Sequence, residues 1–267
     1  MYGMFTSASS LNGNVSNWNT SRVKRMSWMF ANASSFNIDL SMWNTSQVES
    51  TYGMFDTASN FNGNLSSWDT SSVTSMTWMF NKASSFNGDL LTWDTGRVTS
   101  MYGIFASASG FICNSLPWNT SLVTSMSWMF NYASSFNGDV STWNVGRVTS
   151  MYGMLDSARS FNRDLSFWNT SSAMTMSWMF SNALVFISDL SKWNTGKVTS
   201  LYGMFDSASS FNGNVSTWNT GSATTMSWMY SSASAFNGDL SEWNTGQVTS
   251  MYGMFDSVSS FNGNVSS

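Results

Sequence analysis

The sequence predicts a repeat solenoid, a single stack of similar coils, from two periods that run through the whole chain. A unit of 25 residues starts at Met1 and restarts at Met26, Thr51, Met76, Met101, Met126, Met151, Met176, Leu201, Met226 and Met251. A unit this short cannot bury its apolar face alone and must stack on its neighbours. We therefore expect one continuous solenoid of about eleven coils over residues 1–267, with no internal domain boundary.

Each unit is expected to contain two short elements. We number its positions 1 to 25, so that Met76 is position 1 of the fourth unit. Positions 1, 4, 5, 8 and 11 are apolar, which is the spacing of an amphipathic helix, here over residues 76–86. Asn87-Gly88 is typical of the turn that ends a helix. Residues 89–93 predict a short strand, so each coil is expected to have one short parallel strand and one short helix or helical turn.

Stacking converts each unit position into a row of identical side chains along the axis. Position 18 is tryptophan in all ten units that reach it, and position 11 is phenylalanine except for Leu11. We interpret these rows as core. Position 12 is asparagine except at Ile112 and Ile187, and position 14 is asparagine or aspartate. We expect the position 12 amides to bond the backbone of the next coil; a calcium site on this asparagine and aspartate face is the alternative.

The second period, of 50 residues, concerns positions 2 and 3. Odd-numbered units have Tyr-Gly there, and even-numbered units have Ser-Trp or Thr-Trp. On a helical wheel position 3 points outward, and glycine in the adjacent coils would leave room for each indole. The candidate exposed contact face comprises Trp28, Trp78, Trp128, Trp178 and Trp228 with Tyr52, Tyr102, Tyr152 and Tyr202. These rings would lie flat on their own coils, pack against another chain, or stack on sugars.

The surface is predicted to be polar but poorly charged. Only 9% of residues are charged, against roughly 25% in an average soluble protein. A net charge of −4 with ten dispersed basic residues argues against nucleic acid and anionic membranes as partners. The chain has no apolar run long enough to insert into a membrane and no leader at Met1. Such a surface favours self-association or a glycan coat.

Asparagines in the N-x-[ST] pattern are candidate sites for that coat. They are Asn14, Asn19, Asn32, Asn44, Asn64, Asn119, Asn169, Asn214 and Asn264. The alternative interpretation is that these asparagines, serines and threonines only form turns and caps and carry no glycan.

Nothing in the sequence indicates catalysis. The chain has no histidine, no phosphate-binding glycine motif and no acidic pair that is not repeated along the chain. We therefore expect no enzyme activity, no cofactor and no metal. The single cysteine, Cys113, is interpreted as a substituted row position rather than a reactive thiol.

Residues 73–94, VTSMTWMFNKASSFNGDLLTWD, resemble the repeat of BspA-like leucine-rich-repeat surface proteins, and the resemblance extends over the whole chain. It implies a leucine-rich-repeat-like solenoid with a parallel sheet on one side, at the cell surface or outside the cell, in a family often associated with adhesion. The alternation of odd and even units departs from that pattern, as does the lack of a leader, cap or anchor. We expect a segment of a longer array or a protomer that joins end to end.

Three functions remain open from the sequence. The first is a non-enzymatic extracellular structural protein that forms a filament or surface layer by solenoid stacking and is glycosylated, with copies of itself as partners, end to end or laterally. The alternative is an adhesin-like module that recognises a glycan or a host protein through the aromatic face. The third is binding of ice or a mineral by the threonine rows at positions 20 and 24, although gaps such as Lys24 and Val145 argue against it.

Overall fold

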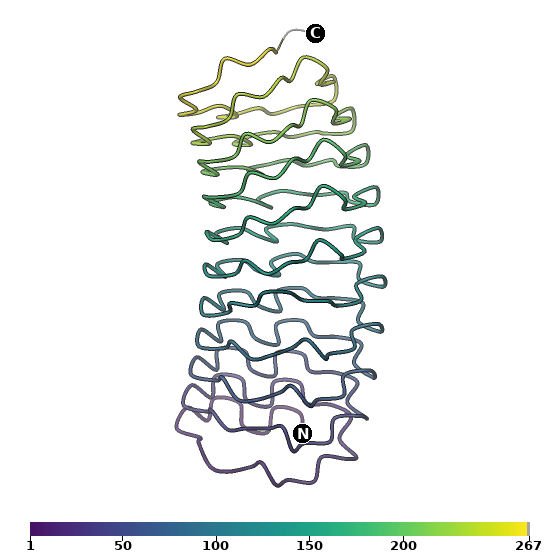
Figure 1. Ribbon diagram of the computed structural model, residues 1–267, viewed down its shortest axis with the longest axis vertical. Coiled ribbons are helices and arrows are strands. Elements are labelled where there is room, and N and C mark those ends of the chain that lie inside the picture. Colours follow the sequence, from purple (N-terminus) through teal and green to yellow (C-terminus); the bar gives the residue numbers. More distant parts are fainter. Residues whose placement is uncertain (266–267) are drawn as a thin grey trace.

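The protein is a stack of coils that follow one another along one axis, with the N-terminus at one end and the C-terminus at the other (Figure 1). The computed structural model describes residues 1–265. Isolated parallel bridges join position 25 of each coil to the same position of the next, at Arg25, Ser50, Ser75, Ser100, Ser125, Ser150, Thr175, Ser200, Thr225 and Ser250. The predicted repeat solenoid is therefore confirmed.

The predicted helix and strand are wrong. Residues 1–265 form turns, bends and isolated bridges, with no α-helix and no extended strand. The helix fails at positions 3 and 7, where the backbone is left-handed: φ is 58° at Trp78 and 56° at Lys82. A right-handed helix cannot contain such residues. The strand expected at residues 89–93 is instead a turn, in which Asp89 Oδ1 accepts the N–H of Leu91 at 2.9 Å.

The left-handed residues produce an alternating pattern of backbone hydrogen bonds. The N–H of Trp78 donates to the carbonyl of Tyr102 in the next coil at 3.0 Å, whereas the N–H of Met79 donates to Met76, three residues back, at 3.1 Å. Phe80 again donates to the next coil. Bonds within a coil and bonds between coils thus alternate along this segment, and its backbone polar groups are satisfied without regular helix or sheet.

Aromatic rows fill the interior of the stack. The rings of Trp68 and Trp93 are nearly parallel, at an angle of 4° and a centroid distance of 6.4 Å. The indole N–H of Trp93 donates to the carbonyl of Leu65 in the preceding coil at 3.2 Å, so the row is hydrogen-bonded as well as buried. Phe80 and Phe86 stack within one coil, with centroids 3.9 Å apart. These contacts make each coil dependent on its neighbours.

The asparagine row at position 12 bonds the coils on another side, as predicted. Oδ1 of Asn37 accepts the N–H of Asn62 at 2.8 Å, and Oδ1 of Asn62 accepts the N–H of Asn87 at 2.8 Å. Ile112 and Ile187 have no side-chain acceptor, so the row is interrupted there. Because the amide oxygens are engaged with backbone N–H groups, this geometry disfavours the calcium alternative for the row.

The fifth unit differs locally from the others. Its position 13 is Cys113, and Ser115 forms a parallel bridge with Asp139 that has no equivalent in the other described coils. The thiol is half-buried, and burial raises the pKa of Cys113 to about 12. A thiol with this pKa stays protonated and is a poor nucleophile, which fits a substituted row position.

Candidate functional site

The aromatic strip is the surface feature that follows the 50-residue period. We define it as Trp28, Trp78, Trp128, Trp178 and Trp228 together with Tyr52, Tyr102, Tyr152, Tyr202 and Tyr252. It takes one residue from each coil between the second and the last. All five tryptophans and the first four tyrosines are half-buried, and Tyr252 is exposed.

Each tryptophan of the strip covers a glycine of the next coil. A methyl group added to Gly153 would lie 2.6 Å from Cε3 of Trp128, too close for the two atoms to coexist. Tyr152 packs against the same indole, with ring centroids 4.9 Å apart and an angle of 59° between the planes. The steric explanation of the glycines is thus correct, although the helical wheel on which it was based is not. The outward direction comes from the left-handed backbone, with φ of 59° at Trp128.

The contacts continue from one tyrosine to the following tryptophan. Burial raises the pKa of the Tyr102 hydroxyl, and the nearby Trp128 indole of the following coil opposes this rise. Trp78 contacts Tyr102 on the other side, at a centroid distance of 5.0 Å. The strip is therefore continuous across these coils rather than a set of separate pairs.

A row of hydroxyl groups adjoins the strip at positions 25 and 2. In this hydroxyl row, Ser127 Oγ lies 2.7 Å from Ser150 Oγ and 3.3 Å from Ser125 Oγ. The serines and threonines at position 25, from Ser50 to Ser250, are half-buried, whereas Arg25 is exposed. The sequence analysis did not identify this row, because it considered only the apolar, aromatic and asparagine positions of the unit.

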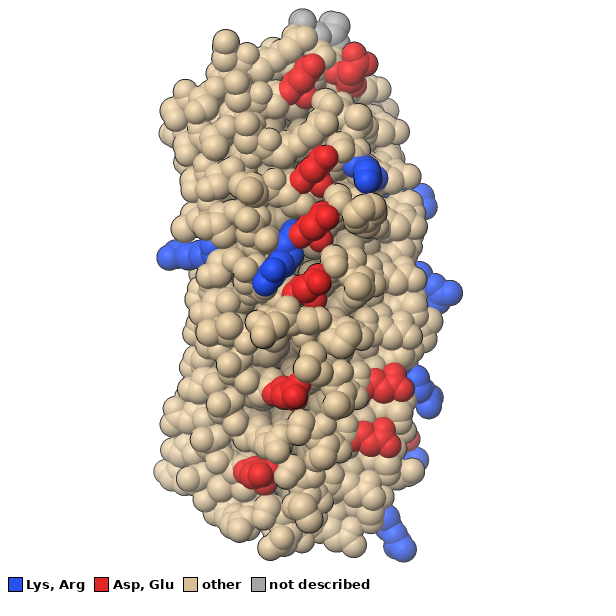
Figure 2. Space-filling model, viewed as in Figure 1, with Lys and Arg blue, Asp and Glu red and all other residues tan. Residues whose placement is uncertain are grey.

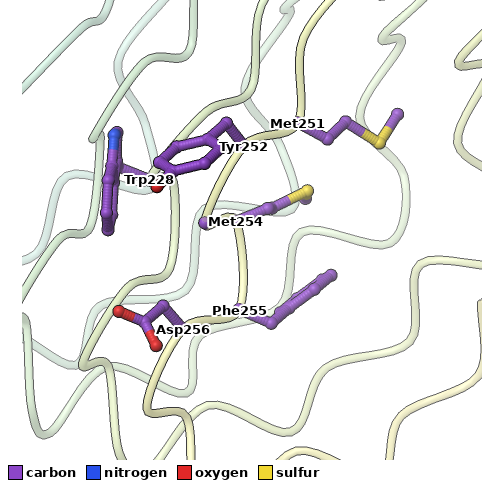
Figure 3. Close-up of a pocket in the computed structure, with 7 residues that line it drawn as sticks. Trp228, Met251, Tyr252, Met254, Phe255 and Asp256 are labelled. Carbon is purple, nitrogen blue, oxygen red and sulfur yellow. The ribbon is translucent and has the colours of Figure 1, made fainter.

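Position 6 supplies a second polar row, of acids and amides. Asn131 Nδ2 donates to Asp156 Oδ2 at 2.9 Å, and Asn81 Nδ2 donates to Asp56 Oδ1 at 2.6 Å. Burial raises the pKa of Asp156 and is only partly offset by its hydrogen bonds. In the last described coil, Asp256 projects to the same side of the backbone as Tyr252, whereas Phe255 projects to the opposite side (Figure 3). The acid–amide row therefore shares the outer face with the strip.

The surroundings of the strip carry little positive charge. At positions 25 and 1–8, the cationic side chains in the sequence are Arg25 and Lys82. The acid–amide row contains four aspartates, Asp56, Asp156, Asp206 and Asp256. On the face of the rod seen in Figure 2, uncharged residues cover most of the surface, and acidic side chains follow one another along the axis. The strip is thus neutral to weakly acidic.

The nine candidate glycosylation asparagines are all exposed. In seven of them Oδ1 accepts the N–H of the residue two positions on: Asn14, Asn19, Asn44, Asn64, Asn119, Asn169 and Asn214. Asn32 has a left-handed backbone, with φ of 56°. For Asn264, the serine of the pattern, Ser266, lies outside the described residues.

The threonine rows proposed for ice or mineral binding do not form one surface. Thr170 at position 20 is buried, and its hydroxyl donates to the carbonyl of Asn194 at 2.9 Å. Thr199 at position 24 is exposed. The prediction that threonines at positions 20 and 24 together form an ice- or mineral-binding surface is therefore wrong.

Within residues 1–265, no three His, Cys, Asp or Glu side chains gather as a metal site would require. The same residues include no helix of the length and hydropathy needed to cross a bilayer.

Comparisons with known proteins place the chain in a repeat family. The model of the family described as "Mycoplasma protein of unknown function, DUF285" matches residues 1–90, 39–116, 113–202 and 185–267. No curated protein matches the chain. The narrower resemblance to BspA-like leucine-rich-repeat proteins stays a prediction.

Among solved structures, one similar chain is titled "Crystal structure of TLR13-ssRNA13 complex". It is 9% identical, with a TM-score of 0.19 over 86% of this chain and 48% of that chain. This chain thus spans about half the length of that one, and a TM-score this low supports no statement about fold or function. The family matches together cover the chain from its first residue to its last, and the protein therefore belongs to the DUF285 family, a repeat family of unknown function.

Proposed function

We propose that the protein is a non-enzymatic, extracellular structural protein that contributes to a filament or surface layer by stacking of its coils. The observation that carries this proposal is the directional bonding between coils. The N–H groups of Trp128 and Phe130 donate to carbonyls of the following coil, Tyr152 and Met154, at 2.8 Å. Each coil thus presents donors to one neighbour in this segment and acceptors to the other, and such head-to-tail contacts propagate into filaments.

The last described coil illustrates the surface that such stacking would cover. Met251, Met254 and Phe255 line a cavity of about 540 Å³ at this end, beside Trp228 and Tyr252 (Figure 3). A coil of another copy placed there would meet the same apolar rows that neighbouring coils bury elsewhere. The burial of such rows is the main favourable contribution to stacking.

Electron microscopy and sedimentation of the full chain test this proposal. We expect filaments with the width of one rod. Met251→Arg places a charge on the end surface and should shorten or abolish them, whereas Met42→Arg, on an exposed side position, should not. Dispersed short rods at all concentrations would contradict the proposal.

Glycosylation is the second part of this proposal. It is supported by the exposure of all nine candidate asparagines and by the scarcity of surface charge. Intact mass of protein from its natural source, before and after enzymatic removal of N-linked glycans, tests it. We expect a mass loss on deglycosylation that becomes smaller when Asn64 and Asn214 are both replaced by glutamine; an unchanged mass on deglycosylation contradicts this part alone.

A second function is favoured by a different observation, the continuous aromatic strip. It is an adhesin-like module in which the strip, rather than the ends of the rod, is the contact surface. Aromatic rings are enriched where proteins contact partners. Replacement of strip tryptophans should then reduce partner binding without affecting filament formation.

A further inference from the structure

We infer that the aromatic strip binds a neutral, extended polysaccharide that lies along the rod axis and stacks its sugar rings on the tryptophans. This inference rests on the second function proposed above, in which the strip is the contact surface. The protein could form filaments without it, so the two ideas can fail separately.

The shape of the strip favours a linear polymer over a second copy of the protein. Coils spaced by about 4.8 Å give a strip roughly 50 Å long, and two to three residues across give a width of roughly 10 Å. The area is then on the order of 500 Å², below the roughly 800 Å² per partner of a stable protein interface. A single polysaccharide chain would fit within this width.

The spacing of the tryptophans also fits such a polymer. They recur in every second coil, or about every 10 Å. In an extended β-1,4-linked glycan, two sugar residues span about the same length and present the same ring face at each repeat. Every second sugar could therefore meet an equivalent indole.

The two polar rows supply the hydrogen bonds that sugar hydroxyls require. On one side are the hydroxyl groups of the hydroxyl row, such as Ser150, which lies 2.7 Å from Ser127. On the other are carboxylates and amides such as Asp156 and Asn131, 2.9 Å apart. Aromatic rings stack on the apolar faces of sugars, and donors and acceptors at the strip edges orient them.

The charges disfavour polyanions as ligands. Asp56, Asp156, Asp206 and Asp256 adjoin the strip, and the cationic residues at positions 25 and 1–8 are Arg25 and Lys82. Coulomb repulsion then disfavours acidic polysaccharides relative to neutral ones.

Sedimentation of the full chain with insoluble polymers tests the inference. The probes are cellulose and chitin powders, with starch granules as an α-linked control and calcium alginate beads as an anionic control. The key variant replaces Trp78, Trp128 and Trp178 by glycine, which is the residue that adjacent coils already use at this φ. A matched control, Phe167→Ser with Met42→Ser, removes exposed apolar side chains that are not in the strip.

We expect wild type and the matched control to bind cellulose or chitin, and the triple variant to lose about tenfold or more in affinity. Quenching of tryptophan fluorescence by cellohexaose or chitohexaose should be lost with it. Circular dichroism verifies the fold, and the single variant Trp128→Gly replaces the triple variant if the latter does not fold.

Three results would overturn the inference. They are the absence of wild-type binding to either neutral polymer, equal binding by the triple variant, and stronger binding to alginate than to the neutral polymers. If the triple variant instead abolishes concentration-dependent association of the protein with itself, the strip is occupied by a second copy. Filaments that form without polysaccharide binding leave the structural function intact.

Discussion

The indole of Trp128 covers the outer face of Gly153 in the next coil, so that Cε3 lies 2.6 Å from where a β-carbon on Gly153 would be. Gly203 and Trp178 repeat this relationship two coils further on, at the same 2.6 Å. Within each pair of coils, the large side chain is at position 3 in one and at position 2 in the other. The 50-residue period is therefore a complementarity of volume between adjacent coils.

Gly153→Ala should test this complementarity directly. The added methyl group meets the Trp128 ring, and φ at Gly153 is 57°, where alanine is unfavourable. We expect the variant to unfold with a free energy lower by about 2–3 kcal/mol, measured by urea denaturation. Gly13→Ala is the control, because its added methyl group has no neighbour within 4 Å. Equal destabilisation by both substitutions would show that steric contact with the indole is unimportant.

The period, the core rows and the asparagine row could be predicted from the sequence because each depends only on stacking. A side chain repeated every 25 residues meets its own copy in the next coil, whatever the backbone does in between. Trp68 and Trp93, for example, stack at 6.4 Å as this reasoning requires. Repetition therefore predicts contacts between coils better than the conformation within one coil.

The conformation within a coil was predicted wrongly because the apolar spacing of positions 1, 4, 5 and 8 is shared by a helix and by the observed chain of turns. The distinguishing signal was glycine at position 3, as in Gly103, which a helix interior disfavours. With φ of 58° it marks a left-handed residue that recurs in every coil. At Trp78, Lys82 and Tyr132 the same conformation is adopted by bulky residues, and propensity alone could not have predicted it.

Tyr230→Phe should stabilise the protein. Tyr230 takes the place of a core phenylalanine, and its hydroxyl is the buried side-chain polar atom without a hydrogen-bond partner in the described part of the chain. Burial also raises the pKa of this tyrosine. Removing the hydroxyl relieves a desolvation cost of roughly 1–3 kcal/mol, seen as a higher Tm. Tyr132→Phe, at a side chain that is 58% exposed, should leave Tm unchanged. A lower Tm for Tyr230→Phe would indicate that the hydroxyl is bonded in solution.

Ile187→Asn should close a gap in the asparagine row. Ile187 donates its N–H to Asn162 Oδ1 at 3.2 Å but offers no side-chain acceptor to the following coil. Its side chain is 57% exposed, so little apolar burial is lost. The new amide would accept the N–H of Asn212, and we expect a gain of about 1 kcal/mol in the free energy of unfolding. Asn62→Ala removes the 2.8 Å bond to Asn87 and should have the opposite sign. Hydrogen exchange at the Asn212 and Asn87 amides would locate both effects.

Asp156→Asn should raise stability at neutral pH and lose this advantage in acid. Burial raises the pKa of Asp156 from its ordinary value of 3.8, so the folded protein binds the proton more tightly than the unfolded chain. The contribution of this group to stability is therefore full below its unfolded pKa and is lost as pH rises through its folded pKa. Asparagine lacks this cost and keeps an oxygen for the bond from Asn131 Nδ2.

Thermal unfolding of Asp156→Asn and wild type between pH 7 and pH 3 measures this difference. The variant should melt higher at pH 7, and the two curves should converge as Asp156 is protonated. Asp39→Asn is the opposite case, because a backbone hydrogen bond from Ser41 lowers the pKa of Asp39. That variant should melt slightly lower than wild type at pH 7 and approach it in acid. Curves for Asp156→Asn that stay parallel to those of wild type at all pH values would mean that the Asp156 carboxylate is fully solvated and that burial does not raise its pKa.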